Sequence, residues 1–226
     1  FSGNIQNAAI AENNSDILAI SNYNRLKISN DGGLTFVEVS QSLPNQFIND
    51  IAFDPNNDDT IIVTYGTYSN NNQKVYITND QGNSWENITY NLGNMPIRSV
   101  VIDHTENSTI YLGAEIGVYK KPMSATSWEL YNENLPNTTM MELEVVYGSN
   151  TLRGTTWGRG VWEYSLVGRE NYPSIRTTNI SNQPTDTQPK EGLDQFVTST
   201  IEFDGDLSSV YVEWSTQSDS DTIQMS

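Results

Sequence analysis

The chain has 226 residues, of which 36% are hydrophobic and 10% aromatic, and it contains no cysteine. Lys and Arg number 11 against 28 Asp and Glu, which gives a formal net charge of −17 at pH 7. Such acidity argues against nucleic acid and anionic membrane surfaces as partners, because both require a basic footprint. The lack of cysteine excludes disulfides, thiol catalysis and cysteine-ligated zinc. No apolar run reaches the ~18 residues of a membrane-spanning helix, so we expect no membrane insertion.

Four repeats follow one another through the first three quarters of the chain. The first covers residues 5–20 and continues downstream, with Ile10 at the position of Phe53 in the second. Residues 54–61 of the second repeat match residues 103–110 of the third, 49 positions later. The third predicts strands at 98–102, 109–113, 117–121 and 127–131, whereas the fourth, residues 141–166, has three strand-like runs. Short β-branched and aromatic runs between Asn, Asp, Gly and Pro clusters, without helical periodicity, predict an all-β fold.

An eight-residue motif occurs twice within these repeats, at residues 29–36 and 78–85. It reads hydroxyl-x-Asp-x-Gly-x-hydroxyl-aromatic, and its two copies lie 49 residues apart. The Asp can accept backbone N–H bonds within its own turn, the Gly can take positive φ, and the hydroxyls can tighten the loop. The aromatic residue then begins the next strand and can bury roughly 150–250 Å² between neighbouring sheets. The motif residues are Ser29, Asp31, Gly33, Thr35 and Phe36 in the first copy and Thr78, Asp80, Gly82, Ser84 and Trp85 in the second.

This motif resembles the Asp-box of sialidase-like and sortilin-like β-propellers, and residues 155–163 resemble the hairpin of the last blade in that group. The resemblance implies a propeller in which the box is structural. The alternative is that Asp31 and Asp80 bind metal or act as catalytic acids. It is disfavoured because turn geometry explains every fixed position of the motif. Three four-stranded blades and one three-stranded blade are few for a propeller, which usually has about four to eight. We therefore expect residues 1–168 to be the C-terminal part of a larger propeller, whose remaining half lies outside this chain. The alternative is a four-bladed closure in which residues 1–6 supply the missing strand.

The composition changes after residue 168. Residues 169–189 are polar and Pro-containing, which predicts a linker, with a loose first strand as the alternative. Residues 194–203 and 209–214 alternate like two strands, and residues 190–226 resemble the start of an immunoglobulin-like or fibronectin-like sandwich of secreted bacterial, Bacteroidetes-like proteins. The fold class is thus a partial β-propeller followed by a partial β-sandwich. The resemblance implies an extracellular or cell-surface location and further domains in the parent protein.

Blade topology assigns each turn to a face. In a four-stranded antiparallel blade the first and third turns, which include the boxes, share one face, and the second turns and inter-blade links share the other. In related propellers ligands bind on this second face or at the channel mouth. An aromatic and amide-rich rim suits sugar or peptide, although Tyr and Asn also populate ordinary polar hairpin loops. The candidate ligand-binding residues are Tyr23, Tyr65, Tyr68, Asn71, Glu115, Trp157 and Arg159, with Asn70 and Asn72 nearby and the links around Pro44, Pro96 and Pro136.

No catalytic set emerges from the sequence. Sialidases need three converging arginines with a Tyr–Glu pair, and the arginines of this chain lack that motif context. Xyloglucanase-like hydrolases use two Asp residues across a cleft between two propellers, and an inverting mechanism requires the two carboxyl groups to lie ~6.5–9.5 Å apart. No motif in this sequence singles out such a pair of Asp residues. We expect no cofactor, although Asp58-Asp59, Asp204-Gly205-Asp206 and Asp219-Ser220-Asp221 leave Ca²⁺ as an alternative to solvated turns.

The sequence therefore favours a non-catalytic binding or scaffolding segment of a large secreted or cell-surface bacterial protein. Its expected partner is a glycan or a protein. The alternative is part of a xyloglucanase-like hydrolase whose active site lies largely outside the chain.

Overall fold

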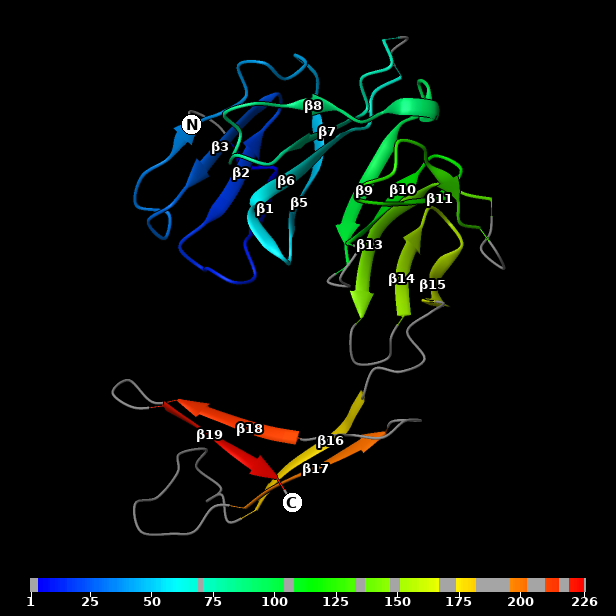
Figure 1. The fold of residues 1–226 in the computed structure, drawn as a ribbon. Coiled ribbons are helices and arrows are strands. Elements are labelled where there is room, and N and C mark those ends of the chain that lie inside the picture. The colour runs from blue at the N-terminus through cyan, green and yellow to red at the C-terminus, as the bar shows by residue number, and fades with distance from the viewer. Residues whose placement is uncertain are drawn as a thin grey trace. The chain divides into compact units, whose positions relative to one another are not determined.

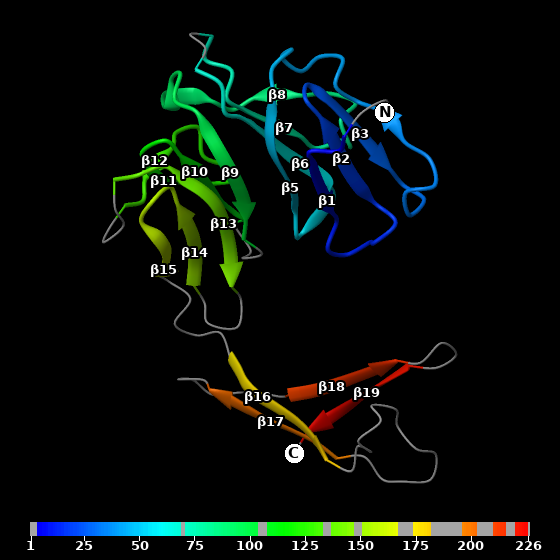
Figure 2. The same ribbon diagram turned by 180° about the vertical axis from the view of Figure 1, so that it is seen from behind.

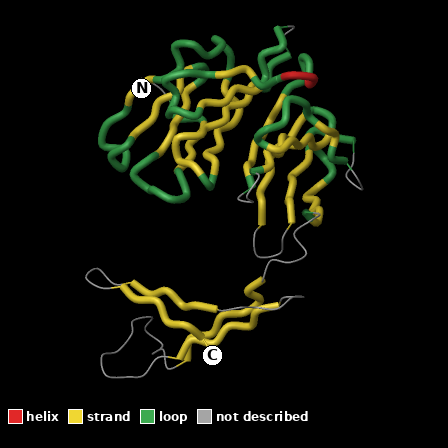
Figure 3. The backbone as a smooth tube through the Cα atoms, in the orientation of Figure 1, coloured by secondary structure: helices red, strands yellow, loops and turns green. Residues whose placement is uncertain are grey.

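The computed structural model describes residues 4–68, 71–103, 108–132, 137–146, 151–166, 174–181, 196–202, 210–215 and 220–225, with side-chain surroundings as far as residue 166. The chain divides into two compact units. Unit 1 comprises Phe1–Val145 and Thr151–Tyr164, and unit 2 comprises Val146–Asn150 and Ser165–Ser226. Strands dominate the described residues, in which the one helical element is the 3₁₀ turn η1 (Tyr90–Leu92) (Figure 3). The all-β prediction is confirmed.

Unit 1 contains four antiparallel sheets in chain order, three with four strands and the last with three (Figures 1 and 2). Sheet 1 has β1 (Asn7–Ile10), β2 (Leu18–Asn22), β3 (Arg25–Ser29) and β4 (Val37–Glu38). Sheet 2 has β5 (Ile48–Asp54), β6 (Asn57–Tyr65), β7 (Val75–Thr78) and β8 (Glu86–Asn87). Sheet 3 has β9 (Ile97–Ile102), β10 (Thr109–Ala114), β11 (Gly117–Pro122) and β12 (Glu129–Leu130). Sheet 4 has β13 (Met140–Val146), β14 (Thr151–Thr156) and β15 (Gly160–Ser165).

These bounds confirm the predicted strands of the third and fourth repeats, except that β12 is shorter than expected. The alternative in which residues 1–6 complete sheet 4 does not hold for Gln6, whose N–H donates to Ser21 O in sheet 1 (2.9 Å). Within the described residues β15 pairs with β14 alone. Sheet 4 therefore presents an open outer edge in the part of the chain described.

The sheets stack through aliphatic side chains. One buried cluster lies between sheets 1 and 2 and includes Leu26, Ile48 and Val63, and a second lies between sheets 2 and 3 and includes Ile62 and Val100. Neighbouring residues of β6 such as Ile62 and Val63 belong to different clusters because successive strand residues point to opposite faces. Sheet 2 is consequently buried on both faces.

Hydrogen bonds also join the first strands of successive sheets. The side chains that make them stand at equivalent positions of the repeats, and each reaches the backbone of the following sheet. Burial raises the pKa of one of them, Asp50. Glu142 occupies the corresponding position of sheet 4, where it is exposed. The bonded atoms are Asn7 Nδ2 and Ile48 O (3.0 Å), Asp50 Oδ2 and Val100 N (2.8 Å), and Ser99 Oγ and Leu143 N (3.1 Å).

The motif aromatics bridge neighbouring sheets as predicted for Trp85. Its Nε1 donates to Val39 O of the preceding sheet (2.9 Å), and Trp128 repeats this bond to Ile88 O one sheet later (2.8 Å). Trp128 is only 3% exposed. Phe36, at the equivalent position of sheet 1, is half-buried. The described residues contain no sheet before sheet 1 on which its ring could pack.

The outward face of sheet 1 carries the equivalents of residues that are interfacial in sheets 2 and 3. Cross-strand pairing places Ile10 beside Leu18 and Ile20 beside Lys27, and Ile10 is 61% exposed. The six positions are Ala8, Ile10, Leu18, Ile20, Lys27 and Phe36; their counterparts in sheet 2 are Ile51, Phe53, Ile61, Val63, Tyr76 and Trp85, which form or contact the cluster between sheets 1 and 2. We call these six positions of sheet 1 the open blade face; Ile10 is exposed on it, whereas Ile20 is buried.

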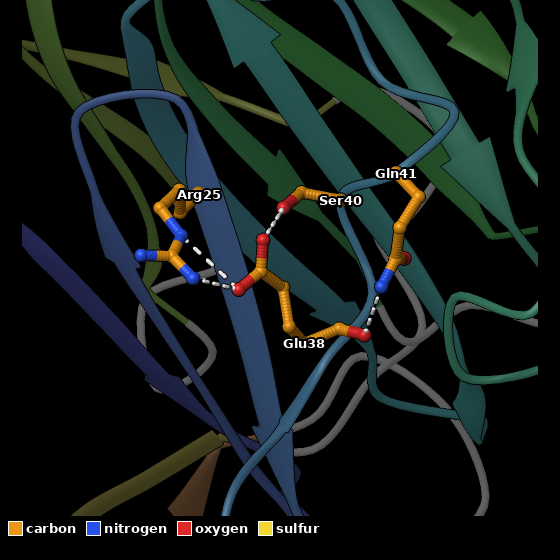
Figure 4. A network of polar contacts seen from close by, with 4 residues as sticks. All are labelled: Arg25, Glu38, Ser40 and Gln41. Carbon is orange, nitrogen blue, oxygen red and sulfur yellow. Dashed lines mark hydrogen bonds and ion pairs between the residues drawn. The ribbon is translucent and has the colours of Figure 1, made fainter.

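An ion pair joins β3 and β4, the last two strands of sheet 1 (Figure 4). Arg25 donates from Nε (3.1 Å) and Nη2 to Glu38 Oε2, and it lowers the pKa of that carboxyl. Ser40 Oγ donates to the other carboxylate oxygen (3.4 Å), and Gln41 Nε2 to the Glu38 backbone carbonyl (2.9 Å). These contacts hold the short strand β4 in place where only two residue pairs join it to β3.

Unit 2 contains two two-stranded antiparallel sheets, β16–β17 and β18–β19. Their bounds are β16 (Ser174–Ser181), β17 (Phe196–Glu202), β18 (Val210–Ser215) and β19 (Ser220–Met225). The predicted strands at 194–203 and 209–214 are confirmed. Within residues 169–189 the alternative of a first strand holds for β16, which pairs with β17, as its β-branched Ile and Thr residues favour. The predicted turn at 204–206 lies outside the described residues, and the immunoglobulin-like sandwich stays a prediction.

Candidate ligand-binding face

The first Asp-box is a closed set of hydrogen bonds within one turn. Asp31 Oδ1 accepts from Thr35 N (2.8 Å) and Ser29 Oγ (2.7 Å), and Oδ2 accepts from Thr35 Oγ1 (2.6 Å). Gly33 N donates to Ser29 Oγ (2.9 Å), and Gly33 takes φ 85°. The hydrogen bonds from Thr35, then those from Ser29, lower the pKa of Asp31 to about 2.

The second box repeats this arrangement. Asp80 accepts from Ser84 N (2.9 Å), Ser84 Oγ (2.6 Å) and Thr78 Oγ1 (2.7 Å), and Gly82 takes φ 82°. Hydrogen bonds from Ser84 and Thr78 lower the pKa of Asp80 to about 2. Both carboxylates therefore accept these hydrogen bonds from residues of their own turn. This geometry supports the structural interpretation of the box.

A lysine holds the third turn of sheet 3, where residues 121–128 keep only the hydroxyl and the aromatic residue at the end of the box. Lys121 stands at the position of Thr78, and its Nζ donates to the carbonyls of Pro122 (3.2 Å) and Met123 (3.0 Å). The amine lies 5.4 Å from the centre of the Trp128 ring, and burial lowers its pKa to about 8. A cation thus replaces the Asp carboxylate as the centre of the turn. The sequence reasoning missed this role, although a lysine at the hydroxyl position was its signal.

Backbone hydrogen bonds confirm how the turns are assigned to two faces. First and third turns of a sheet bond one another, and second turns bond the inter-sheet links. The first group comprises Gly32 N to Asp16 O (3.0 Å), Gln81 N to Asp59 O (3.0 Å) and Met123 N to Ser108 O (2.8 Å). The second comprises Ile48 N to Tyr23 O (2.8 Å), Glu115 N to Pro96 O (3.1 Å), Gly117 N to Thr138 O (3.0 Å) and Trp157 N to Thr139 O (2.9 Å).

Each of the four second turns presents one large, exposed apolar side chain. Tyr23 is 54% exposed, Tyr68 74%, Ile116 53% and Trp157 72%. We call these four side chains the rim row. Three were predicted from the sequence, whereas Ile116 was missed because an aliphatic residue in a polar loop carries no recognition signal of its own. Exposed rings of this size present apolar faces on which a flat ligand can stack.

Tyr23 is held in an unusual conformation. Its φ is 51°, in the left-handed region that bulky residues rarely adopt. The Tyr23 N–H donates to Gln6 Oε1 (2.5 Å), and its ring meets Phe47 edge-on at 5.7 Å. Such a conformation costs on the order of 1 kcal/mol or more and persists only when the surroundings impose it. The ring is thus positioned by its neighbours rather than free to turn away.

Three polar side chains meet in the middle of this face. Arg98 Nη2 lies 3.5 Å from Glu115 Oε2, and the Tyr68 hydroxyl bonds to Glu115, which raises the pKa of the phenol. The side chains of Arg98 and Glu115 are 28% and 31% exposed. The Nε atom of Arg98 is buried and has no hydrogen-bond partner among the described residues. The structure thus joins two predicted residues, from sheets 2 and 3, and adds Arg98, which the sequence analysis did not single out.

Tyr65 does not belong to this face, which corrects the prediction. It is fully buried, its ring packs against Tyr76 at 5.9 Å, and burial raises the pKa of its phenol. Its position in β6 turns the side chain into the core between sheets 1 and 2. The sequence reasoning failed here because the end of the strand, and with it the direction of the side chain, could not be fixed from the loop composition.

The other candidates lie in the turns themselves. Asn71 is exposed and donates from Nδ2 to Gln73 Oε1 (3.0 Å), and Arg159 is exposed beside Trp157 in the β14–β15 hairpin. Asn72 N donates to Asn94 Oδ1 (2.9 Å), which ties the second turn of sheet 2 to the next link. Asn70 and Pro136 lie outside the described residues. Asn71, Arg159 and the rim row are therefore surface positions on one face of unit 1.

The described residues contain no group of three or more His, Asp or Glu side chains that could hold a metal ion. Within those residues no helix is long and apolar enough to cross a membrane.

Comparison with known proteins gives a consistent fold. The family model "Sortilin-Vps10: Sortilin, neurotensin receptor 3" matches residues 24–134, and no curated protein matches the chain. Similar solved structures include the GH74 enzyme of Niastella koreensis (18% identity, TM-score 0.55) and the GH74 xyloglucanase of Xanthomonas campestris (15%, 0.55). The extracellular domain of a proposed one component system from B. thetaiotaomicron is also similar (20%, 0.56).

The similarity covers most of this chain but a minor share of each relative. It spans 71%, 70% and 74% of the chain and 28%, 28% and 21% of the Niastella, Xanthomonas and Bacteroides structures. At these identities the likeness establishes the fold. Unit 1 is a partial β-propeller, and its four sheets are propeller blades.

Proposed function

We propose that unit 1 is a non-catalytic binding segment of a larger propeller protein and that it contacts a glycan or a protein ligand. The observation that carries this proposal is the rim row, in which every described second turn exposes one large apolar side chain on the same face. Tyr68, Glu115 and Arg98 add a polar centre to that row. A face made of exposed rings and amide-rich turns offers stacking and hydrogen bonding together, which suits ligand binding better than chemistry.

The experiment is a binding screen with matched variants. The full chain is tested against arrays of glycans and peptides, and any ligand found is measured again with Trp157→Ala and Tyr68→Ala. Each lost ring contact is expected to weaken binding by ~2–10-fold, since one aromatic contact contributes about 0.5–1.5 kcal/mol. The control is Leu34→Ala, because Leu34 is 86% exposed but lies in a box turn on the opposite face. Equal losses in all three variants would remove the face from the proposal.

A second candidate function is a share in a glycoside hydrolase. It is favoured by one finding, the fold shared with two GH74 enzymes. In that case blades outside this chain would supply most of the active site. A hydrolysis screen of the chain on plant and algal polysaccharides separates the two functions, and turnover of any of them by the chain would overturn the non-catalytic proposal.

We also propose that the partner of the open blade face is a further blade of the same parent protein. The supporting observation is the equivalence of its six positions with residues that are interfacial in sheet 2. Ile10→Ser is expected to lower dye binding to exposed apolar surface and to reduce concentration-dependent association in sedimentation. Unchanged dye binding would contradict this assignment. An extracellular or cell-surface location is proposed from the likeness to an extracellular domain, and surface labelling of intact cells tests it.

A further inference from the structure

We propose that the outer face of sheet 4 is an inter-blade interface built on charge, and that its partner is a blade of the same parent protein that carries basic side chains. This inference goes beyond ligand binding and concerns the last sheet of unit 1, which lies next to sheet 3 (Figures 1 and 2). Five residues define this surface, which we call the charged blade face: Glu142, Glu144, Arg153, Val161 and Glu163.

All three strands of sheet 4 direct these side chains away from sheet 3. The Leu143 side chain lies against Gly113 of sheet 3, and the Tyr164 ring lies 4.7 Å from the Tyr131 ring of that sheet. Successive residues of a strand point to opposite faces, so the chain neighbours of these residues point outward. The outward neighbours are Glu144 after Leu143, Arg153 after the buried Leu152, and Glu163 before Tyr164.

An ion network joins the outward side chains and leaves them negative. Arg153 donates to Glu163 Oε2 from Nε (3.1 Å) and Nη2 (2.8 Å), and its Nη1 lies 3.9 Å from Glu144 Oε2. The side chains of Arg153, Glu163 and Glu144 are 42%, 45% and 67% exposed. Alternation places Glu142 on the same side as Glu144, so three carboxylates face one guanidinium. This excess of negative charge favours a basic partner.

The repeat register indicates that this face is covered by a further sheet. Val161 is 64% exposed, whereas Val75 and Val118, which hold its position in sheets 2 and 3, are fully buried. Glu163 stands at the position of Ile77 in sheet 2, which is only 6% exposed. Sheet 4 therefore continues the series of inter-blade interfaces, but with charged residues where sheet 2 has aliphatic ones.

The first strand of sheet 4 carries an acceptor whose donor the series of sheets predicts. Asp50 Oδ2 accepts a hydrogen bond from Val100 N of sheet 3 (2.8 Å). Ser99 Oγ accepts one from Leu143 N of sheet 4 (3.1 Å). Glu142 is next in this series, and its carboxylate accepts no hydrogen bond from the described residues. The backbone N–H at the equivalent position of the docked blade supplies the missing donor.

The test compares this chain with the whole parent protein. The chain has no cysteine, so Val161→Cys introduces a single thiol on the charged blade face, and mass spectrometry of the labelled peptide follows its alkylation. We expect alkylation to be at least ~10-fold slower in the parent than in the chain alone, because a docked face must open before it reacts. Leu34→Cys is the control, since Leu34 is 86% exposed in a box turn, and it should react at one rate in both.

Salt and substitution then test whether charge holds the interface. High salt should speed the alkylation of Val161→Cys in the parent but not in the chain, because it screens charged contacts. Glu144→Lys combined with Glu163→Lys should abolish the ~10-fold protection, since like charges would then meet across the interface. Glu142→Leu should weaken the protection, whereas Glu142→Gln, which keeps an acceptor oxygen, should retain most of it.

Two results would overturn the inference. Equal alkylation rates of Val161→Cys in the parent and in the chain would show that the face lies in water. Protection that neither salt nor the two lysine substitutions reduce would show that the face is covered without charged contacts. Both results leave the rim row untouched, so they are distinguishable from a failure of the proposed ligand-binding function.

Discussion

Trp128→Phe tests whether the inter-blade tryptophan bond stabilises unit 1. The substitution keeps an aromatic ring between sheets 2 and 3 but removes the Nε1–H that donates to Ile88 O at 2.8 Å. It also reproduces the residue type found at the equivalent position of sheet 1, Phe36. The change is therefore conservative in shape and specific in chemistry.

The expected loss follows from burial. Trp128 and Ile88 are each 3% exposed, so the orphaned carbonyl cannot readily be reached by water. An unsatisfied buried acceptor costs about 1–3 kcal/mol, and the smaller ring adds about 1 kcal/mol for the space it leaves. We expect Trp128→Phe to lower the free energy of unfolding by about 2–4 kcal/mol. Trp85→Phe, which removes the same bond from a half-exposed ring, should cost about 1 kcal/mol.

The assay is urea unfolding followed by far-ultraviolet circular dichroism, which reports mainly on the β-strands, whereas fluorescence would depend on the tryptophans that are changed. The midpoint should fall with little change in slope, as expected for a loss of stability without a change in the surface exposed on unfolding. A Trp128→Phe protein within about 0.5 kcal/mol of the unmodified chain would refute the reasoning. So would a greater loss from Trp85→Phe.

Three further predictions concern the turns. Burial lowers the pKa of Lys121 to about 8 from an ordinary 10.5, so between these pH values the unfolded chain binds more protons than the folded chain. The free energy of unfolding should therefore rise from pH 8 to 10.5, and Lys121→Met should remove that rise from the urea midpoints. Hydrogen bonds lower the pKa of Asp80 to about 2, so its contribution is present above about 4 and lost as pH falls through 2; Asp80→Asn should flatten an acid titration of unfolding, and an unchanged profile would contradict this. Gly82→Ala, at φ 82°, places a new Cβ 2.7 Å from Val39 Cβ and should lower the free energy of unfolding by more than ~2 kcal/mol in urea. Gly158→Ala, at φ 79° with no atom within 4 Å of the new Cβ, should lower it by only ~1 kcal/mol. Equal losses would show that the contact with Val39 is unimportant.

The repeat register was predictable because local chemistry sets it. The box contacts join residues no more than four positions apart, so a pattern of eight residues contains every group that the turn requires. Strand positions in the third repeat followed from the same register. The strand β16 was harder to place, because its partners in β17, from Phe196 opposite Ser181 to Glu202 opposite Ser174, lie well outside any local sequence pattern.

The candidate site was only partly predictable. Tyr68, Glu115 and Trp157 were found because the register assigns their turns to one face. Arg98 was not found, since it lies in the strand β9 and meets Glu115 only through the pairing of β9 with β10. An arginine within a strand gives no sequence signal for the turn that it will reach.

The sequence by itself determined the blades, the turns and the face on which each turn lies, because these depend on hydrogen bonds between near neighbours and on alternation along strands. The tertiary structure decided which side chains on that face are available. Tyr65 and Tyr68 are three residues apart, yet one is fully buried between sheets 1 and 2 and the other is 74% exposed beside Glu115. The difference arises because packing between sheets buries whatever points into their shared core, and that direction depends on where strand β6 ends.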